Sequence, residues 1–145
     1  MPTTDRELCH DAIRTALAQR AGDLSDAGRI ARATSDTWNR MAAQLVPVIG
    51  TLGVEALFKR SVRLTGGACP WMTPLGEETD GASLPARVTT LLAGREPDTA
   101  AQAGYSLLTT FTEQLAILIG HSLTKRLLAP AWASTPPEAG QETTP

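Results

Sequence analysis

The sequence predicts an all-α protein, a compact bundle of five or six helices, and three observations lead to this prediction. Hydrophobic residues make up 42% of the chain and are mostly alanine and leucine, whereas aromatic residues make up only 4%. Such a composition favours helices over strands. Apolar residues also recur at spacings of three and four along several segments, which is the period of a helix with one buried face. The length of 145 residues is typical of one domain, which we place at residues 1–132.

The first helix is expected to begin near Thr4 and to end at Gly22. Thr4 and Glu7 have the spacing of a capping box, in which each side chain binds a free backbone N–H group of the first turn. Gly22 is a residue type that commonly ends helices. One face of this helix carries its apolar residues: Leu8, Ala12, Ile13, Ala16 and Leu17.

The second helical segment is predicted to cover about residues 25–49. Its apolar stripe consists of Ile30, Thr34, Trp38, Met41, Leu45 and Val48. Pro47 lacks a backbone donor and its ring clashes with the preceding turn, so the helix is expected to kink or end between Ala43 and Val46. Gly50 reinforces this break. A third helix is expected at about residues 52–64, followed by Gly66 and Gly67.

A long central loop is predicted next, because GGACPWMTPLGEETDGA holds two prolines and four glycines within residues 66–82. Helices resume at Ser83 and pause at Gly94. The last long helix is expected to begin with Asp98 as its cap, to bend near Gly120 and to be stopped by Pro130. Residues 133–145 lack an apolar anchor and are predicted to be disordered.

The chain contains nearly the same phrase twice, QLVPVIG ending at Gly50 and QLAILIG ending at Gly120. Omitting four residues, about one helical turn, extends the match: Leu57, Lys59 and Arg60 then align with Leu123, Lys125 and Arg126. The repeat predicts an internal duplication at about residues 34–66 and 104–130, with halves packed around a pseudo-two-fold axis. A chance likeness between two leucine-rich helices is the alternative.

Charge and composition argue against several classes of protein. The net charge of -2 and the pI of about 5.6 differ from the basic surface of nucleic-acid-binding proteins. The polar N-terminal segment lacks the apolar core of a signal peptide, and the apolar run LAILIG is too short to span a bilayer. Cys9 and Cys69 lack the paired spacing of a zinc site. We therefore expect a cytoplasmic protein without a metal, a nucleic-acid partner or a membrane partner.

Two residues carry possible ligand chemistry in the central loop. Cys69 precedes Pro70 and Trp71, and a loop cysteine in this context can bind haem iron or sense redox changes through its thiolate. The alternative is structural: Trp71 and the next residue, Met72, plug one end of the bundle.

His121 is a possible phosphoacceptor, because Lys125 follows it by one helical turn and can offset the charge of a phosphoryl group. However, helical phosphotransfer domains place Leu-Lys-Gly directly after the histidine, and HSLTKR has a different spacing. A polar residue at a helix bend is the alternative interpretation.

Five basic residues are the best surface candidates: Lys59, Arg60, Arg63, Lys125 and Arg126. In symmetric halves they would occupy related positions and could receive an acidic partner, although cations also simply favour helix C-termini. The sequence contains no Ser-His-Asp order, phosphate-binding loop or HExxH motif. It therefore predicts a non-enzymatic regulatory or adaptor protein without a cofactor, which binds a protein partner through helical contacts and forms a homodimer. A small-molecule or haem/redox sensor using the Cys69 loop and a phosphotransfer intermediate using His121 are the alternatives.

Overall fold

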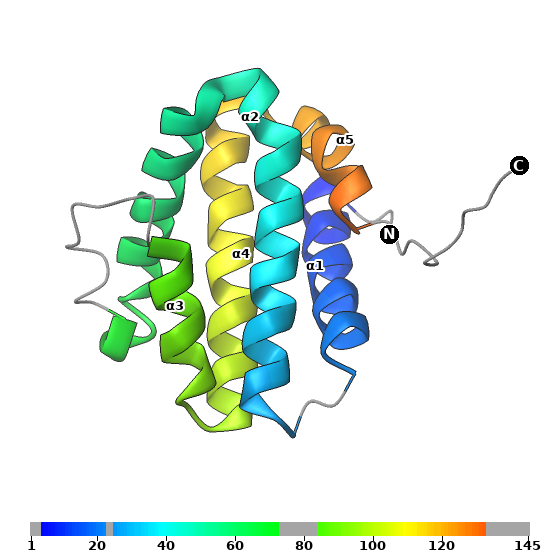
Figure 1. Ribbon diagram of the computed structural model, residues 1–145. Coiled ribbons are helices and arrows are strands. Elements are labelled where there is room, and N and C mark those ends of the chain that lie inside the picture. Colours follow the sequence, from blue (N-terminus) through cyan, green and yellow to red (C-terminus); the bar gives the residue numbers. More distant parts are fainter. Residues whose placement is uncertain (1–3, 23–24, 73–83, 133–145) are drawn as a thin grey trace, which may run out of the picture.

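The computed structural model describes residues 4–22, 25–72 and 84–132, and in these ranges all regular structure is helical. The prediction of an all-α bundle is confirmed (Figure 1). Its helices are α1 (Asp5–Ala21), α2 (Ala27–Thr65), α3 (Leu84–Ala93), α4 (Pro97–Ile119) and α5 (His121–Trp132). Most of the predicted central loop and the predicted disordered tail lie outside the described residues.

Helix α1 begins as its sequence predicts. The Thr4 hydroxyl accepts a hydrogen bond from the Glu7 backbone N–H at 3.1 Å, and the Glu7 carboxylate accepts one from the Thr4 N–H at 3.2 Å. The two bonds satisfy two donors that the first turn would otherwise leave unpaired. The helix ends at Gly22, whose φ of 71° suits a residue without a side chain.

Helix α2 continues through Pro47, so the prediction of a break before this proline is wrong. The backbone leaves the helical conformation only at Gly50, where φ is 83° and ψ is 161°. Pro47 removes a single backbone donor, and the helix turns three residues later in any case. The change of direction therefore depends on Gly50, a residue type that tolerates positive φ.

Two predictions in the second half are also corrected. Helix α4 begins at Pro97, before the expected cap Asp98, since a proline in the first turn removes an N–H group that has no helical partner there. Helix α5 does not stop at Pro130 but runs to Trp132. The last turn is held by Ala131, which is fully buried and whose carbonyl accepts a hydrogen bond of 2.7 Å from Arg20.

Helices α2 and α4 form the middle of the bundle, and the other helices pack around them. The first part of α2 and helix α4 run side by side through the middle of the bundle and turn at the same end (Figure 1). Helix α3 packs mainly against α2, whereas α1 packs against α2, α4 and α5. Each half of the chain therefore buries its apolar faces largely against the other half.

The halves correspond at a constant offset of 70 residues. The helical segments 27–49 and 97–119 have the same length, and the glycines that follow them share one backbone conformation, with φ of 83° and 88° and ψ of 161° and 154°. Residues buried in the first half are Ile30, Thr34, Met41, Leu45, Val54 and Phe58, and their counterparts Ala100, Gly104, Phe111, Leu115, Thr124 and Leu128 are buried as well. The correspondence continues past the glycines without the expected gap of four residues. These facts agree with the predicted duplication and symmetry, which stay predictions.

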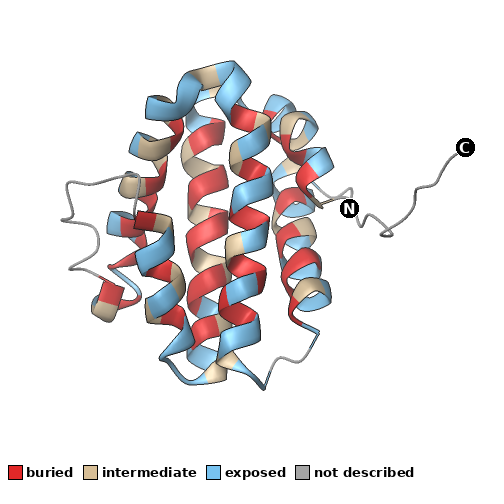
Figure 2. Ribbon diagram, in the orientation of Figure 1, coloured by how far each residue is buried: buried red, intermediate tan, exposed pale blue. Residues whose placement is uncertain are grey.

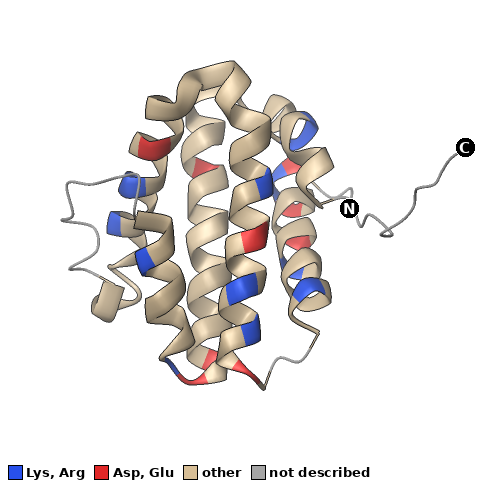
Figure 3. Ribbon diagram, viewed as in Figure 1, with Lys and Arg blue, Asp and Glu red and all other residues tan. Residues whose placement is uncertain are grey.

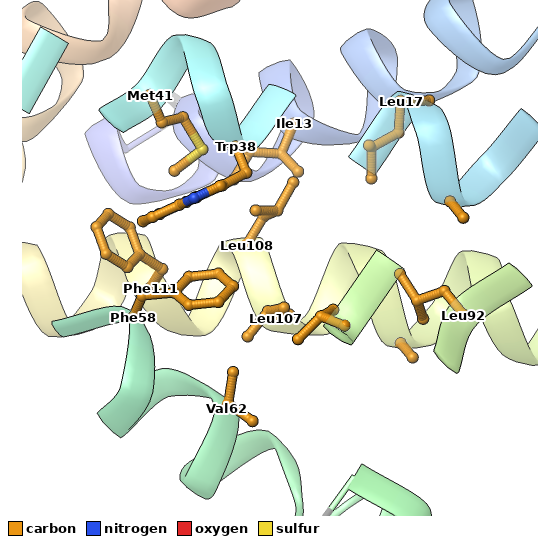
Figure 4. Packing of buried hydrophobic residues seen from close by; sticks show 14 of the residues in the cluster. Ile13, Leu17, Trp38, Met41, Phe58, Val62, Leu92, Leu107, Leu108 and Phe111 are labelled. Atoms are coloured by element: carbon orange, nitrogen blue, oxygen red, sulfur yellow. The ribbon is translucent and has the colours of Figure 1, made fainter. Parts of the chain in front are cut away.

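The centre of the core is an aromatic group on three helical segments. Trp38 packs against Phe58, with ring centroids 4.2 Å apart, and its edge meets Phe111 at 4.8 Å with an interplanar angle of 84° (Figure 4). The T-shaped contact with Phe111 falls in the range of favourable aromatic pairs, about 4.5–7 Å between centroids, and the tilted contact with Phe58 is slightly closer than that range. Along α2 and α4, buried residues alternate with exposed ones (Figure 2).

Gly104 on α4 lies directly against Thr34 on α2. A Cβ atom added at Gly104 would lie 2.5 Å from the Thr34 hydroxyl oxygen, far inside the sum of van der Waals radii. This hydroxyl is held in place because it donates to the Ile30 carbonyl at 2.9 Å. The two residues are equivalent at the offset of 70, so this tight contact joins equivalent positions of the two halves.

We expect Gly104→Ala to lower the free energy of unfolding by about 1–2 kcal/mol. Overpacking typically costs about 1–3 kcal/mol, and the higher helix propensity of alanine offsets up to about 1 kcal/mol of it. Urea denaturation of the single and double variants measures the effect. In the Thr34→Ala background the hydroxyl oxygen at 2.5 Å is gone and the residue 34 Cβ lies at an ordinary 3.5 Å from the added methyl group, so the substitution should become neutral or stabilising there. An equal loss in both backgrounds would contradict the contact.

Candidate functional site

Both histidines of the chain converge on one carboxylate, and we call the group Arg6, His10, Glu113 and His121 the Glu113 cluster. Arg6 Nε lies 2.6 Å and His10 Nε2 2.9 Å from one Glu113 oxygen, and His121 Nε2 lies 3.6 Å from the other. The cluster joins the start of α1 to the end of α4 and the start of α5. Beside it, Lys125 of α5 pairs with Asp5 of α1 at 2.9 Å.

The electrostatics of the cluster keep Glu113 ionised. Burial by itself raises the pKa of this carboxyl group, but the hydrogen bonds and charges of Arg6 and His10 outweigh the burial, and the net pKa is lowered. Among the described residues, no group of three or more His, Cys, Asp or Glu side chains is arranged to hold a metal ion. The contacts of Glu113 tie three helices together.

We expect Glu113→Gln to destabilise the protein by on the order of 1 kcal/mol at neutral pH, because a neutral amide replaces the acceptor of charged hydrogen bonds. The lowered pKa means that Glu113 stabilises the fold above its ordinary pKa of 4.5, and that this stability is lost as the pH falls through the folded-state pKa. Thermal unfolding of both proteins between pH 7 and pH 3 should therefore show a difference that shrinks below about pH 4.5. Glu96→Gln is the control, since Glu96 is exposed and makes no capping bond. A difference independent of pH would contradict this assignment.

The predicted phosphoacceptor His121 lies inside this cluster. Its side chain is 45% exposed, yet its nearest ionised partner is the negative Glu113, which would repel an incoming phosphoryl group. The Lys125 ammonium group, expected to assist it, is bound to Asp5. The geometry therefore lends no support to phosphotransfer.

The five predicted basic residues are not gathered into one site. Arg60 donates to the Gln114 side chain at 2.9 Å, and Lys125 pairs with Asp5. Lys59, Arg60 and Arg63 belong to α2 after its bend, whereas Lys125 and Arg126 belong to α5, and Figure 3 shows these two segments on different sides of the bundle. A single acidic partner of modest size would meet only one of the two groups.

Cys69 and Trp71 occupy structural positions. Cys69 is buried in the core, and burial raises the pKa of its thiol. A protonated, buried thiol is a poor nucleophile and metal ligand. Met72 is completely buried, and the Arg95 guanidinium stacks over the Trp71 ring at 4.4 Å. These contacts favour the plug interpretation of the segment. Cys9 is likewise buried, and both cysteines are free.

A shallow groove of about 500 Å³ runs between α1 and α4. Arg14 lies along it, stacks on the Tyr105 ring at 4.7 Å and donates to the Tyr105 hydroxyl at 3.0 Å. A second bond at 3.2 Å joins Arg14 to Asp11. The Arg14 side chain, which lies along the groove, is thus already bound within the protein.

Large apolar side chains are exposed where α2 and the α4–α5 pair turn, and we call this surface the apolar end. It consists of Val46, Val48, Leu52, Ile117, Leu118 and Leu123. Leu52 is 81% exposed, Ile117 75% and Leu118 63%. Val48 was expected in the inward-facing stripe of the second helical segment, and this assignment is wrong, because the side chain is 50% exposed. The exposed ribbon at this end in Figure 2 coincides with a region free of acidic and basic residues in Figure 3.

The absence of charge at the apolar end extends over two stretches of sequence. In α2, no acidic or basic residue lies between Arg40 and Glu55, and on α4 and α5 none lies between Glu113 and Lys125 except His121. Soluble proteins rarely leave a contiguous apolar patch of this kind in water without a use for it. The apolar end is therefore the strongest candidate for a binding surface.

Of the helices that the structure describes, α2 has the length and composition that a membrane crossing requires. Its best 18-residue window has a mean hydropathy of 1.6, and 22% of that window is buried. Length and composition alone are weak evidence for a span. The bend at Gly50 also divides α2 into segments of which only the first, residues 27–49, approaches the length of a span, and that segment carries Arg29, Arg32, Asp36 and Arg40.

Comparisons with protein-family models, with curated proteins and with solved structures find no match to this sequence.

Proposed function

We propose that the protein is a non-enzymatic regulatory or adaptor protein that binds a protein partner through its apolar end. The observation that supports this proposal is the exposure of six large apolar side chains at one end of the bundle. These side chains are between 37% and 81% exposed, and soluble monomers rarely gather that many exposed large apolar side chains at one end.

The surroundings of the apolar end support a protein partner. The core of a protein interface is depleted in charge and its rim is polar. Here the uncharged surface is bordered by residues of both signs, including Arg40, Glu55, Glu113 and Arg126. The candidate sites with catalytic or ligand-binding residue types are instead occupied by contacts within the fold, as the Glu113 cluster and the buried Cys69 illustrate.

Site-specific photo-crosslinking in the native cell tests the proposal. A photoreactive amino acid at Leu118 should yield a crosslinked protein product, whereas the same group at Leu64 should not. Leu64 is the matched control because it is an exposed leucine, at 46%, near the C-terminus of α2 and outside the apolar end. Equal crosslinking at both positions, or no protein product at Leu118, would overturn the proposal.

A further inference from the structure

We infer that the partner at the apolar end is a second copy of this chain, bound end to end around a two-fold axis. This inference rests on the proposed function of the apolar end and specifies what it binds. A two-fold interface uses the same patch on both subunits, so the patch must be complementary to itself.

Charge is the first argument for a second copy. Most surfaces fail to complement themselves, because a charge near the axis meets its own like charge. The apolar end avoids this conflict, since none of its six residues is charged and the sequence around each bend is free of acidic and basic residues except His121. The bordering residues carry both signs, so that Arg40 or Arg126 of one copy can approach Glu55 of the other.

Area is the second argument. Six large apolar side chains, each between 37% and 81% exposed, on each of two copies suit an interface at the small end of the specific, stable class, about 1,200 Å² in total. Polar atoms of the border add to this value. The interface is therefore large enough for a reversible dimer and lies below the range of an obligate one, which agrees with a protomer that already has its own closed core.

A membrane surface is the competing occupant, and the residues at the apolar end do not favour it. Proteins that rest on a bilayer typically place tryptophan or tyrosine at the interface and a strongly basic face above it. Neither a tryptophan nor a tyrosine belongs to the apolar end. Trp38, the tryptophan nearest to its residues in the sequence, is buried in the core. The border carries acidic as well as basic residues, and the net charge of the chain is -2.

Sedimentation equilibrium of the full chain from low to high micromolar concentration tests the inference. The wild type should form a concentration-dependent dimer. Leu52→Glu and Ile117→Glu should each weaken it by at least about 100-fold, because two-fold symmetry places every new carboxylate in the interface twice. Leu64→Glu adds the same charge outside the apolar end and should leave the dimer unchanged. Circular dichroism of each variant establishes that the fold is intact.

The other outcomes separate this inference from the proposed function. A wild type that stays monomeric throughout would overturn the second copy but leave a different protein partner open to the crosslinking test. A dimer that persists in both glutamate variants would show that the apolar end is not the interface. Flotation of the wild type, but not of Ile117→Glu, with vesicles of phosphatidylcholine and phosphatidylglycerol would identify a lipid surface and overturn both proposals.

Discussion

Replacing Phe111 with alanine is expected to lower the free energy of unfolding by about 3–5 kcal/mol, the usual cost of deleting a buried aromatic ring. Phe111 has no exposed surface and lies on α4, where its ring meets the edge of Trp38. The substitution would open a cavity in the aromatic group between the two halves. Since domains of this size are stabilised by about 5–15 kcal/mol, the loss would be a large share of the total.

Urea denaturation followed by circular dichroism measures this loss. Phe111→Leu should cost less than Phe111→Ala, because leucine fills more of the space. Gln102→Ala is the control on the same helix: the residue is exposed and lies outside the apolar end, so its truncation should change stability by no more than about 0.5 kcal/mol. Similar losses for the two alanine variants would contradict the assignment of Phe111 to the core.

Replacing either Gly50 or Gly120 with alanine should lower the free energy of unfolding by about 1–3 kcal/mol. The double variant should lose roughly the sum of the two effects. Both glycines combine a positive φ with an extended ψ near 155–160°, a region that only glycine adopts without strain. Space is not the obstacle, since a Cβ atom at either position would meet nothing within 4 Å. The cost is therefore one of backbone conformation.

Gly53→Ala is the control for these variants. Gly53 lies in the helical part of α2, and a Cβ atom there meets Ile49 at an ordinary 3.4 Å, so alanine should stabilise the helix by up to about 1 kcal/mol. Introducing D-alanine at position 120 by chemical synthesis gives a second control, because a D-residue accommodates positive φ. If L-alanine at 50 and 120 were harmless, the bends would not depend on these glycines.

The features of the fold that could be predicted from the sequence are those that depend on interactions between residues close together in the chain. The capping box of Thr4 and Glu7 fixed the start of α1, and the spacing of apolar residues located the long helices. The bends at Gly50 and Gly120 followed from residue type. In contrast, Pro47 and Pro130 were expected to end helices, yet the surrounding turns tolerate the loss of one backbone bond.

The candidate sites depended on packing and were harder to predict. Val48 and Leu118 continue an apolar stripe, and only the position of the bends shows that these residues extend past the core. The Glu113 cluster joins residues 103 positions apart, His10 and Glu113, for which no local spacing exists. A useful signal was present nevertheless: Glu113 is the only acidic residue between Asp98 and Glu138, in an otherwise apolar helix.

The interleaving of the two halves has a consequence for how the chain reaches its folded state. Helix α2 packs against α4, about 70 residues away in sequence, and α1 contacts α5 at an even greater separation. Helical proteins usually fold quickly because most of their contacts are local, and long-range contacts slow the search. This bundle should therefore have a high contact order for its class. During synthesis, the apolar stripe of α2 therefore stays exposed until α4 has emerged from the ribosome and can pack against it.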